Sequence, residues 1–111
     1  MSSQFVVLGD TATIVCHSPV VWWEFQSNSD HRSVLIFNGH NKVDISQVKN
    51  FNVTSSEDDE SHPISILSLY DVQLNYAGMF RCNDPGDDTK KLLEHELGIL
   101  GGSESYTYQY T

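Results

Sequence analysis

Apolar and polar residues alternate along several short stretches of the chain, and this period of two constrains the fold more than any other feature. The alternation is clearest over residues 11–16, 21–25 and 93–99. Successive side chains of a β-strand point to opposite faces of a sheet, so a strand buried on one face shows this pattern. Turn residues such as Asn38-Gly39 separate the stretches. The sequence therefore predicts an all-β sandwich or barrel of short strands.

Length and charge narrow the class of protein. A chain of 111 residues suits one domain with its own core. It carries 15 acidic and 6 basic residues, for a net charge of −9. Phosphate binding needs a clustered Lys/Arg surface, so nucleic acid is excluded as a partner. No apolar run approaches the ~20 residues that cross a bilayer, so we expect no direct membrane insertion by this segment.

The chain has two cysteines, Cys16 and Cys82, far apart in the sequence. A metal site typically shows closer-spaced pairs with histidines nearby, and none of the five histidines stands at such a spacing. The pair favours a single disulfide, which implies an oxidising compartment. Two separate buried thiols in a cytosolic protein are the alternative that composition leaves open.

Several motifs, in the right order, carry a family resemblance. The run Tyr76-Ala-Gly78-Met-Phe80-Arg-Cys82 resembles the E–F corner of immunoglobulin domains, where Asp, Gly, Tyr and Cys stand at even spacings. Other segments are similar to further parts of that family: Leu67–Val72 to strand E, Gly9–Cys16 to the turn into strand B, Trp22-Trp23 to strand C, Val34–Gly39 to strand C′ and Asn50–Thr54 to strand D. The resemblance covers Phe5 to about Leu100, nearly the whole chain.

The resemblance implies a variable-type immunoglobulin β-sandwich over residues 1–101, with two antiparallel sheets and one inter-sheet disulfide, Cys16–Cys82. The expected core residues are Trp23, Leu69 and Phe80. Alternation with Val21 and Phe25 places Trp23 inside and Trp22 outside, with the reverse as the alternative. Residues 102–111 are expected to be a linker or stalk. The alternative is an edge strand that presents Tyr106, Tyr108 and Tyr110 on one face.

Three positions depart from the family pattern. Phe80 stands where the family has its corner tyrosine, so that hydroxyl is missing. Tyr76 replaces the family's aspartate, and Asn50 replaces its basic partner before strand D. Both members of the usual ion pair are absent together, which leaves no lone buried charge.

The resemblance also implies where a partner binds, namely the front sheet of strands G, F, C and C′ and the F–G loop, Asn83–Lys91. The expected contact residues are Trp22, Phe37, Arg81, Asn83, Asp84, Asp87 and Asp88. The implied function is recognition or adhesion by the extracellular part of a cell-surface protein or by a secreted protein. The partner is a protein ligand or counter-receptor, with a homodimer as one form. A spacer domain and a glycan-binding domain are the alternatives.

Further motifs are few. Asn52-Val53-Thr54 is an N-glycosylation sequon, which predicts an exposed, modified Asn52. The acidic groups at 57–60 and 84–88 lack the ligand spacing of a calcium loop and are expected to be solvated. The chain has no nucleophile elbow and no glycine-rich phosphate loop. We therefore expect no catalysis, no cofactor and no metal.

Overall fold

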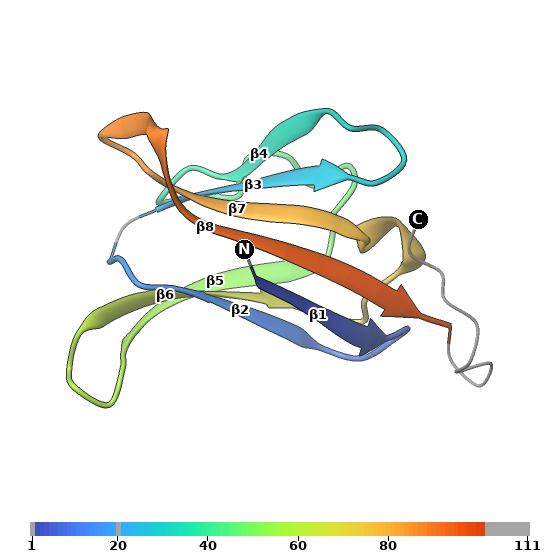
Figure 1. Cartoon of the computed structure of the whole chain (residues 1–111), viewed down its shortest axis with the longest axis horizontal. Coiled ribbons are helices and arrows are strands. Elements are labelled where there is room, and N and C mark those ends of the chain that lie inside the picture. The colour runs from blue at the N-terminus through green and yellow to red at the C-terminus, as the bar shows by residue number, and fades with distance from the viewer. Residues whose placement is uncertain (1, 20, 102–111) are drawn as a thin grey trace.

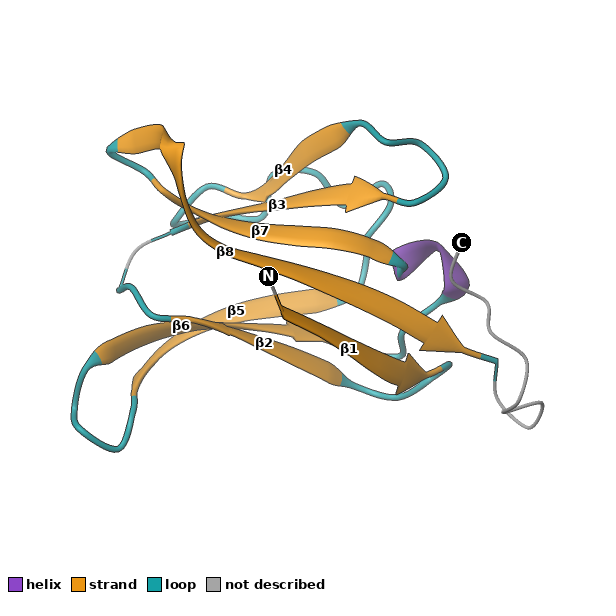
Figure 2. Ribbon diagram, in the orientation of Figure 1, coloured by secondary structure: helices purple, strands orange, loops and turns teal. Residues whose placement is uncertain are grey.

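Two stacked β-sheets make up the computed structural model, which describes residues 2–19 and 21–101 (Figure 1). The strands are β1 Ser2–Val7, β2 Ala12–Cys16, β3 Trp22–Ser27, β4 Ser33–Phe37, β5 Phe51–Glu57, β6 Pro63–Leu69, β7 Gly78–Asp84 and β8 Asp87–Leu100. A short 3-10 helix, η1 Leu74–Tyr76, precedes β7 (Figure 2). The predicted tail, 102–111, lies outside the described residues.

The strands divide into a five-stranded and a three-stranded sheet. The first, called here the front sheet, has the order β1-β8-β7-β3-β4, and the second, the back sheet, has the order β2-β6-β5. Strand β1 runs parallel to β8, whereas the other neighbours are antiparallel. The prediction of a two-sheet all-β sandwich is confirmed.

The apolar residues that recur with a period of two form a core between the sheets. In β2 and β3, every second residue is buried and the residues between are exposed or half-buried. The rings of Phe25 and Phe80 lie opposite each other in register, with centroids 4.6 Å apart. Trp23, Leu69 and Phe80 are fully buried, which resolves the choice between the two tryptophans in favour of Trp23. Burial of such large side chains is the main stabilising term of the fold.

A disulfide joins the sheets through the middle of this core. Cys16 in β2 and Cys82 in β7 are bonded, with Cα atoms 6.4 Å apart. The bond closes a loop of 66 positions, which stabilises the fold by roughly 4 kcal/mol in the chain-entropy model. Beside it, the indole N–H of Trp23 donates a hydrogen bond across the sheets to the hydroxyl of Ser65, at 3.3 Å. The predicted disulfide is therefore confirmed.

At the corner before β7, hydrogen bonds take the place of the ion pair that the family pattern has there. The hydroxyl of Tyr76 accepts hydrogen bonds from the backbone N–H groups of Lys49, at 3.3 Å, and Asn50, at 3.2 Å. Tyr76 is buried, so these bonds satisfy a polar atom inside the protein. The tyrosine hydroxyl thus links the corner to the segment before β5 without any charge.

Two segments connect β5 to the strands before and after it in the chain. The acidic residues 57–60, which were expected to be solvated, lie at the turn between β5 and β6, and these strands pair as far as Glu57 and Pro63. Residues 38–50 contain no strand, although one isolated bridge pairs Phe37 with Lys42. The front sheet therefore ends at β4 within the described part of the chain.

A buried histidine makes hydrogen bonds that hold β1 against the rest of the sandwich. The Nδ1 atom of His95, in β8, lies 2.6 Å from the hydroxyl oxygen of Ser2. The side-chain amide of Gln4 donates to the Nε2 atom of His95, at 2.8 Å, and to the carbonyl of Thr13 in the back sheet, at 3.3 Å. A ring nitrogen that accepts such a bond carries no proton, so this network needs neutral His95. Burial lowers the pKa of His95 below its ordinary value of 6.5.

We expect the free energy of unfolding to fall as the pH drops below 6.5. Because the folded pKa of His95 is lowered, the unfolded chain binds the proton first. The stabilisation is complete above 6.5 and is lost as the pH falls toward the folded value. Urea unfolding at pH 7.5 and pH 5.5 measures the difference. His95→Gln should shrink it, whereas the exposed control His40→Gln should not; an equal pH dependence in His95→Gln would contradict the assignment.

Gly78→Ala should destabilise the fold by about 2 kcal/mol. Gly78 begins β7 with φ +156°, and a Cβ there would collide with the carbonyl oxygen of Gln26 on β3. In the control Gly86→Ala, a new Cβ would meet only the carboxylate of Asp84, at 3.4 Å. Urea unfolding compares the two variants. Equal losses of stability would show that the close approach of β7 and β3 is not the cause.

Candidate binding surface on the front sheet

The outward side chains of the front sheet form a surface, called here the front face. Because successive side chains of a strand point to opposite faces, these side chains point away from the core. Most of them are half-buried. They are Phe5 of β1, Trp22, Glu24 and Gln26 of β3, Leu35 of β4, Met79 and Arg81 of β7, and Glu94 and Glu96 of β8. The front face is the side of the front sheet on which a partner has access to side chains from five strands.

Arg81 lies at the centre of the front face and is held on two sides. Its Nε donates to the carboxylate of Glu94 at 2.8 Å, and its Nη1 donates to the side-chain oxygen of Gln26 at 2.9 Å. Only 18% of the Arg81 side chain is exposed. The hydrogen bond from Arg81 holds the pKa of Glu94 below its ordinary value. The guanidinium is therefore fixed in one orientation by two charge-assisted hydrogen bonds.

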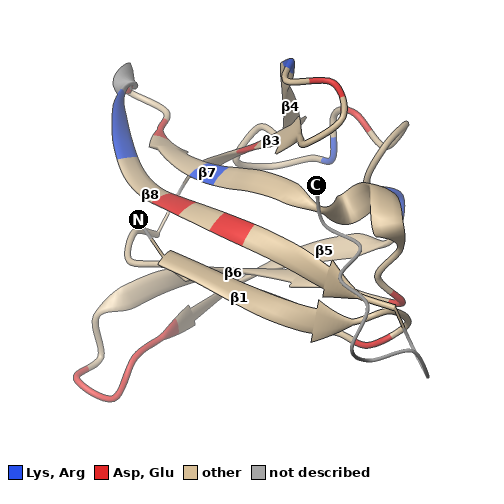
Figure 3. Ribbon diagram, turned by 45° about the vertical axis from the view of Figure 1, so that its right-hand side comes forward, with Lys and Arg blue, Asp and Glu red and all other residues tan. Residues whose placement is uncertain are grey.

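Acidic side chains outnumber basic ones on this surface. Figure 3 shows acidic segments along β8 and a basic segment on the neighbouring strand β7. These are Glu94 and Glu96 on β8 and Arg81 on β7, with Glu24 adding a further acid on β3. Glu94 is paired with Arg81, and Glu24 accepts a hydrogen bond from the hydroxyl of Ser33 at 3.3 Å. The front face thus carries charges of both signs at its centre and only negative charges toward β1.

Trp22 is on the front face as expected, but Asn83 is not accessible. The register sets Asn83 opposite both Trp22 on β3 and Lys91 on β8. Register shifts on either side of Asn83 bend β7 at this point, and both Cys82 and Asn83 become buried. The side-chain oxygen and nitrogen of Asn83 have no hydrogen-bond partner among the described residues. This placement corrects the expectation that Asn83 contacts a partner.

The predicted F–G loop is a hairpin with strand on both sides. Strand β7 continues to Asp84, β8 starts at Asp87, and only Pro85 and Gly86 lie between them. The backbone N–H of Gly86 donates to the carboxylate of Asp84 at 2.8 Å, which closes the turn. Asp87 is exposed at the tip, and the side chain of Asp88 lies outside the described set. Strand pairing thus replaces the loop expected over 83–91.

Two other predicted sites lie away from the front face. A register shift between Trp23 and Glu24 sets Phe37 opposite Trp23, so Phe37 is half-buried and packs against the core. This corrects its expected role as a front-face contact. Asn52 is exposed on β5, an edge strand of the back sheet. A glycan there would cover the sheet opposite to the front face.

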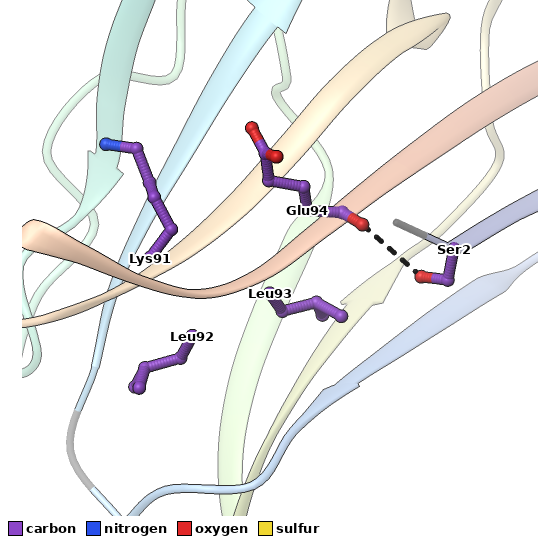
Figure 4. A pocket seen from close by; sticks show the side chains of 5 residues that line it. All are labelled: Ser2, Lys91, Leu92, Leu93 and Glu94. Carbon is purple, nitrogen blue, oxygen red and sulfur yellow. Dashed lines mark hydrogen bonds between the residues drawn. The ribbon is translucent and has the colours of Figure 1, made fainter.

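Strand β8 extends beyond β1 and leaves a shallow open hollow of about 420 Å³ (Figure 4). Strand β1 pairs only with His95–Leu100. The hydroxyl of Ser2 donates to the carbonyl of Glu94 at 3.5 Å, at the point where the pairing ends. The side chains of Lys91 and Glu94 point to one side of β8, and those of Leu92 and Leu93 point to the other. Leu92 and Leu93 pack against the core, so the hollow is an open surface beside the sheet edge.

Within residues 2–19 and 21–101, no group of three or more His, Cys, Asp or Glu residues is placed to hold a metal ion. No helix in this part of the chain is long and apolar enough to cross a membrane.

Sequence reasoning missed two features of the site. His95 lies at an inward position of the alternating segment 93–99, and a polar residue at such a position is a signal for a buried hydrogen-bond network. Phe5 and Glu96 come together only because β1 pairs in parallel with β8. No local pattern in the sequence reveals that pairing.

Comparisons with known proteins identify the fold. No family model and no curated protein matches the chain. Among solved structures, the crystal structure of the ZIG-8 IG1 homodimer matches with a TM-score of 0.60 and 18% identity. The match covers 90% of this chain and 79% of the ZIG-8 chain. The chain has an immunoglobulin fold. Within this fold the chain has an inter-sheet disulfide and a core tryptophan, and the Tyr76 hydroxyl makes its hydrogen bonds at the corner where the resemblance implies an ion pair.

Asn83→Val should raise the free energy of unfolding by about 1 kcal/mol, because a buried amide without partners retains its desolvation cost. Valine also suits a strand. Urea unfolding measures the change. The exposed control Asn41→Val should leave stability nearly unchanged. A clear loss of stability in Asn83→Val would show that the amide makes a stabilising interaction.

Proposed function

We propose that this immunoglobulin domain is a non-catalytic recognition domain that works outside the cell and binds a protein partner through its front face. The observation that carries the proposal is the fixed Gln26–Arg81–Glu94 network, which lies between half-buried apolar side chains such as Trp22 and Met79. Tryptophan and arginine are the residues that most often dominate binding energy. A guanidinium that is already oriented loses less entropy when a partner binds.

Other features support the same assignment. The disulfide suits an oxidising compartment and hence a secreted protein or an ectodomain. The exposed sequon at Asn52 lies on the back sheet, so a glycan would leave the front face open. The ZIG-8 structure is described as a homodimer, which makes a second copy of this chain one partner to test.

Front-face substitutions should weaken partner binding. A tetravalent form of the chain is tested against itself and against an array of extracellular protein domains. We expect Trp22→Ala and Arg81→Glu each to weaken any binding by about tenfold or more, since each removes a central contact. Ser56→Arg, on exposed β5 of the back sheet, is the matched control and should bind normally.

The opposite pattern would sink this proposal. Binding that survives both front-face changes and disappears in Ser56→Arg would place the partner on the back sheet. Circular dichroism and thermal unfolding of each variant separate loss of contact from loss of fold.

A further inference from the structure

The outward side chains of the back sheet form a second surface, called here the back face. Cys16 and Ser65 lie opposite each other and point inward, to the disulfide and to Trp23. The next residues along both strands therefore point outward. The register aligns the outward residues in two rows across β2, β6 and β5, with Val15, Ile66 and Thr54 in one row and Thr13, Ser68 and Asn52 in the other. Asn52 thus ends its row at the edge of the sheet.

The back face carries no charged side chain, although the protein has a net charge of −9. Glu57, at the end of β5, is the one charged residue in the three strands. Figure 3 shows β5 and β6 tan along most of their length, with acidic residues at the turn between them. In the front sheet, by contrast, charged residues lie within β3, β7 and β8. Electrostatic repulsion therefore protects the back face less than the front face from contact with other copies.

The back face also has exposed apolar area and an open strand edge. Val15 is 39% exposed, and Ile66 beside it is half-buried. Strand β5 pairs only with β6, so its other edge has no neighbouring strand in the described part of the chain. Edge strands are commonly protected by lysine, proline or a covering segment, and β5 contains neither lysine nor proline. A cover of another kind is therefore expected here.

We propose that a glycan on Asn52 covers the back face and the open edge of β5; this inference rests on the extracellular location proposed above. Asn52 and Thr54 are both exposed, and with Val53 between them they form the sequon. Both residues belong to the back face itself, so the attachment point lies on the surface that lacks a cover. The glycan is then a part of this protein that shields one sheet and leaves the other open to a partner.

The attachment exchanges one bond at the sugar for another. A transferase of the secretory pathway takes the oligosaccharide from a lipid pyrophosphate, which is the co-reactant. The bond between C1 of the first N-acetylglucosamine and the pyrophosphate oxygen breaks, and a bond between C1 and Nδ2 of Asn52 forms. The amide nitrogen loses one proton, and the lipid pyrophosphate is the leaving group. The step involves no oxidation or reduction.

The first sugars reach the apolar row from Asn52. Neighbouring strands lie about 4.8 Å apart, so Asn52 and Thr13 are separated by about 10 Å across β6, a distance that two linked sugars span. N-acetylglucosamine has C–H groups on its ring faces and hydroxyl and amide groups at its rim. The C–H groups suit Ile66 and Val15, and the rim suits the hydroxyls of Ser68 and Thr13. A neutral sugar loses no ion hydration when it packs on this uncharged face.

The test expresses the full chain behind a secretion leader in mammalian cells and measures the intact mass before and after enzymatic removal of the glycan. We expect one glycan on the wild type and none on Asn52→Gln or Thr54→Val, whereas Thr54→Ser keeps it. Packing is followed by NMR of protein with ¹³C-labelled isoleucine and valine. Relative to Asn52→Gln, the glycoprotein should show shifted methyl signals for Ile66 and Val15 and unchanged signals for Ile99 in the core.

The matched control moves the glycan to another place on the surface. Asn52→Gln combined with Val43→Thr creates a sequon at exposed Asn41, between β4 and β5. We expect this glycoprotein and Asn52→Gln to self-associate about tenfold more strongly than the wild type, because one or two apolar side chains are left uncovered. Sedimentation equilibrium measures the difference.

An unmodified Asn52 in the secreted protein would overturn the proposal. Methyl signals of Ile66 and Val15 that do not respond to the glycan would do the same. A wild-type glycoprotein that dimerises as strongly as Asn52→Gln would make a second copy, and not the glycan, the occupant of the back face. The recognition function fails separately, because normal partner binding by Trp22→Ala and Arg81→Glu, which lie on the other sheet, leaves the results at Asn52 unchanged.

Discussion

The structure depends on a four-residue link between the sheets. Cys82 and Trp23 lie side by side in the front sheet, and Cys16 and Ser65 lie side by side in the back sheet. Across the gap between the sheets, the disulfide joins Cys16 to Cys82, and the hydrogen bond from the indole joins Trp23 to Ser65. The covalent bond restricts the unfolded chain, whereas the indole fills the space beside the sulfur atoms. The remaining core residues pack around this link.

With the sheets fixed in this way, the outward faces are free to carry different chemistry. The front face has a rigid polar centre at Arg81, an acidic region toward β1 and a tryptophan near β3. The position of β1 matters most for the acidic region, because β1 pairs with β8 and sets Ser3 opposite Glu96. His95 and Gln4 hold β1 in place by hydrogen bonds that require an uncharged imidazole. These bonds add to the parallel pairing of β1 with β8, which places β1 at the edge of the front sheet.

Much of the fold could be predicted because alternation and motif spacing report burial directly. Trp23 and Phe80 follow from the period of two, and the disulfide follows from the strand signatures around Cys16 and Cys82. The site was predicted less well because irregular strand pairing disrupts the same rule. The shift around Asn83 buries that residue, and the shift beside Trp23 packs Phe37 against the core, although the resemblance implied that both contact a partner. A bulge has no reliable sequence signal, since it depends on how two strands meet.

The sequence by itself determined the all-β class, the order of the strands along the chain, the inward face of each regular strand and the pair of cysteines. These properties are local, or they belong to motifs whose residues stand close together. The tertiary structure alone decided that Arg81 is fixed by Gln26 and Glu94, that β1 is held through His95, and that β1 pairs in parallel with β8. Each of these arrangements joins strands distant in the sequence. Strand pairing and register, which arise from packing of the whole chain, bring them together.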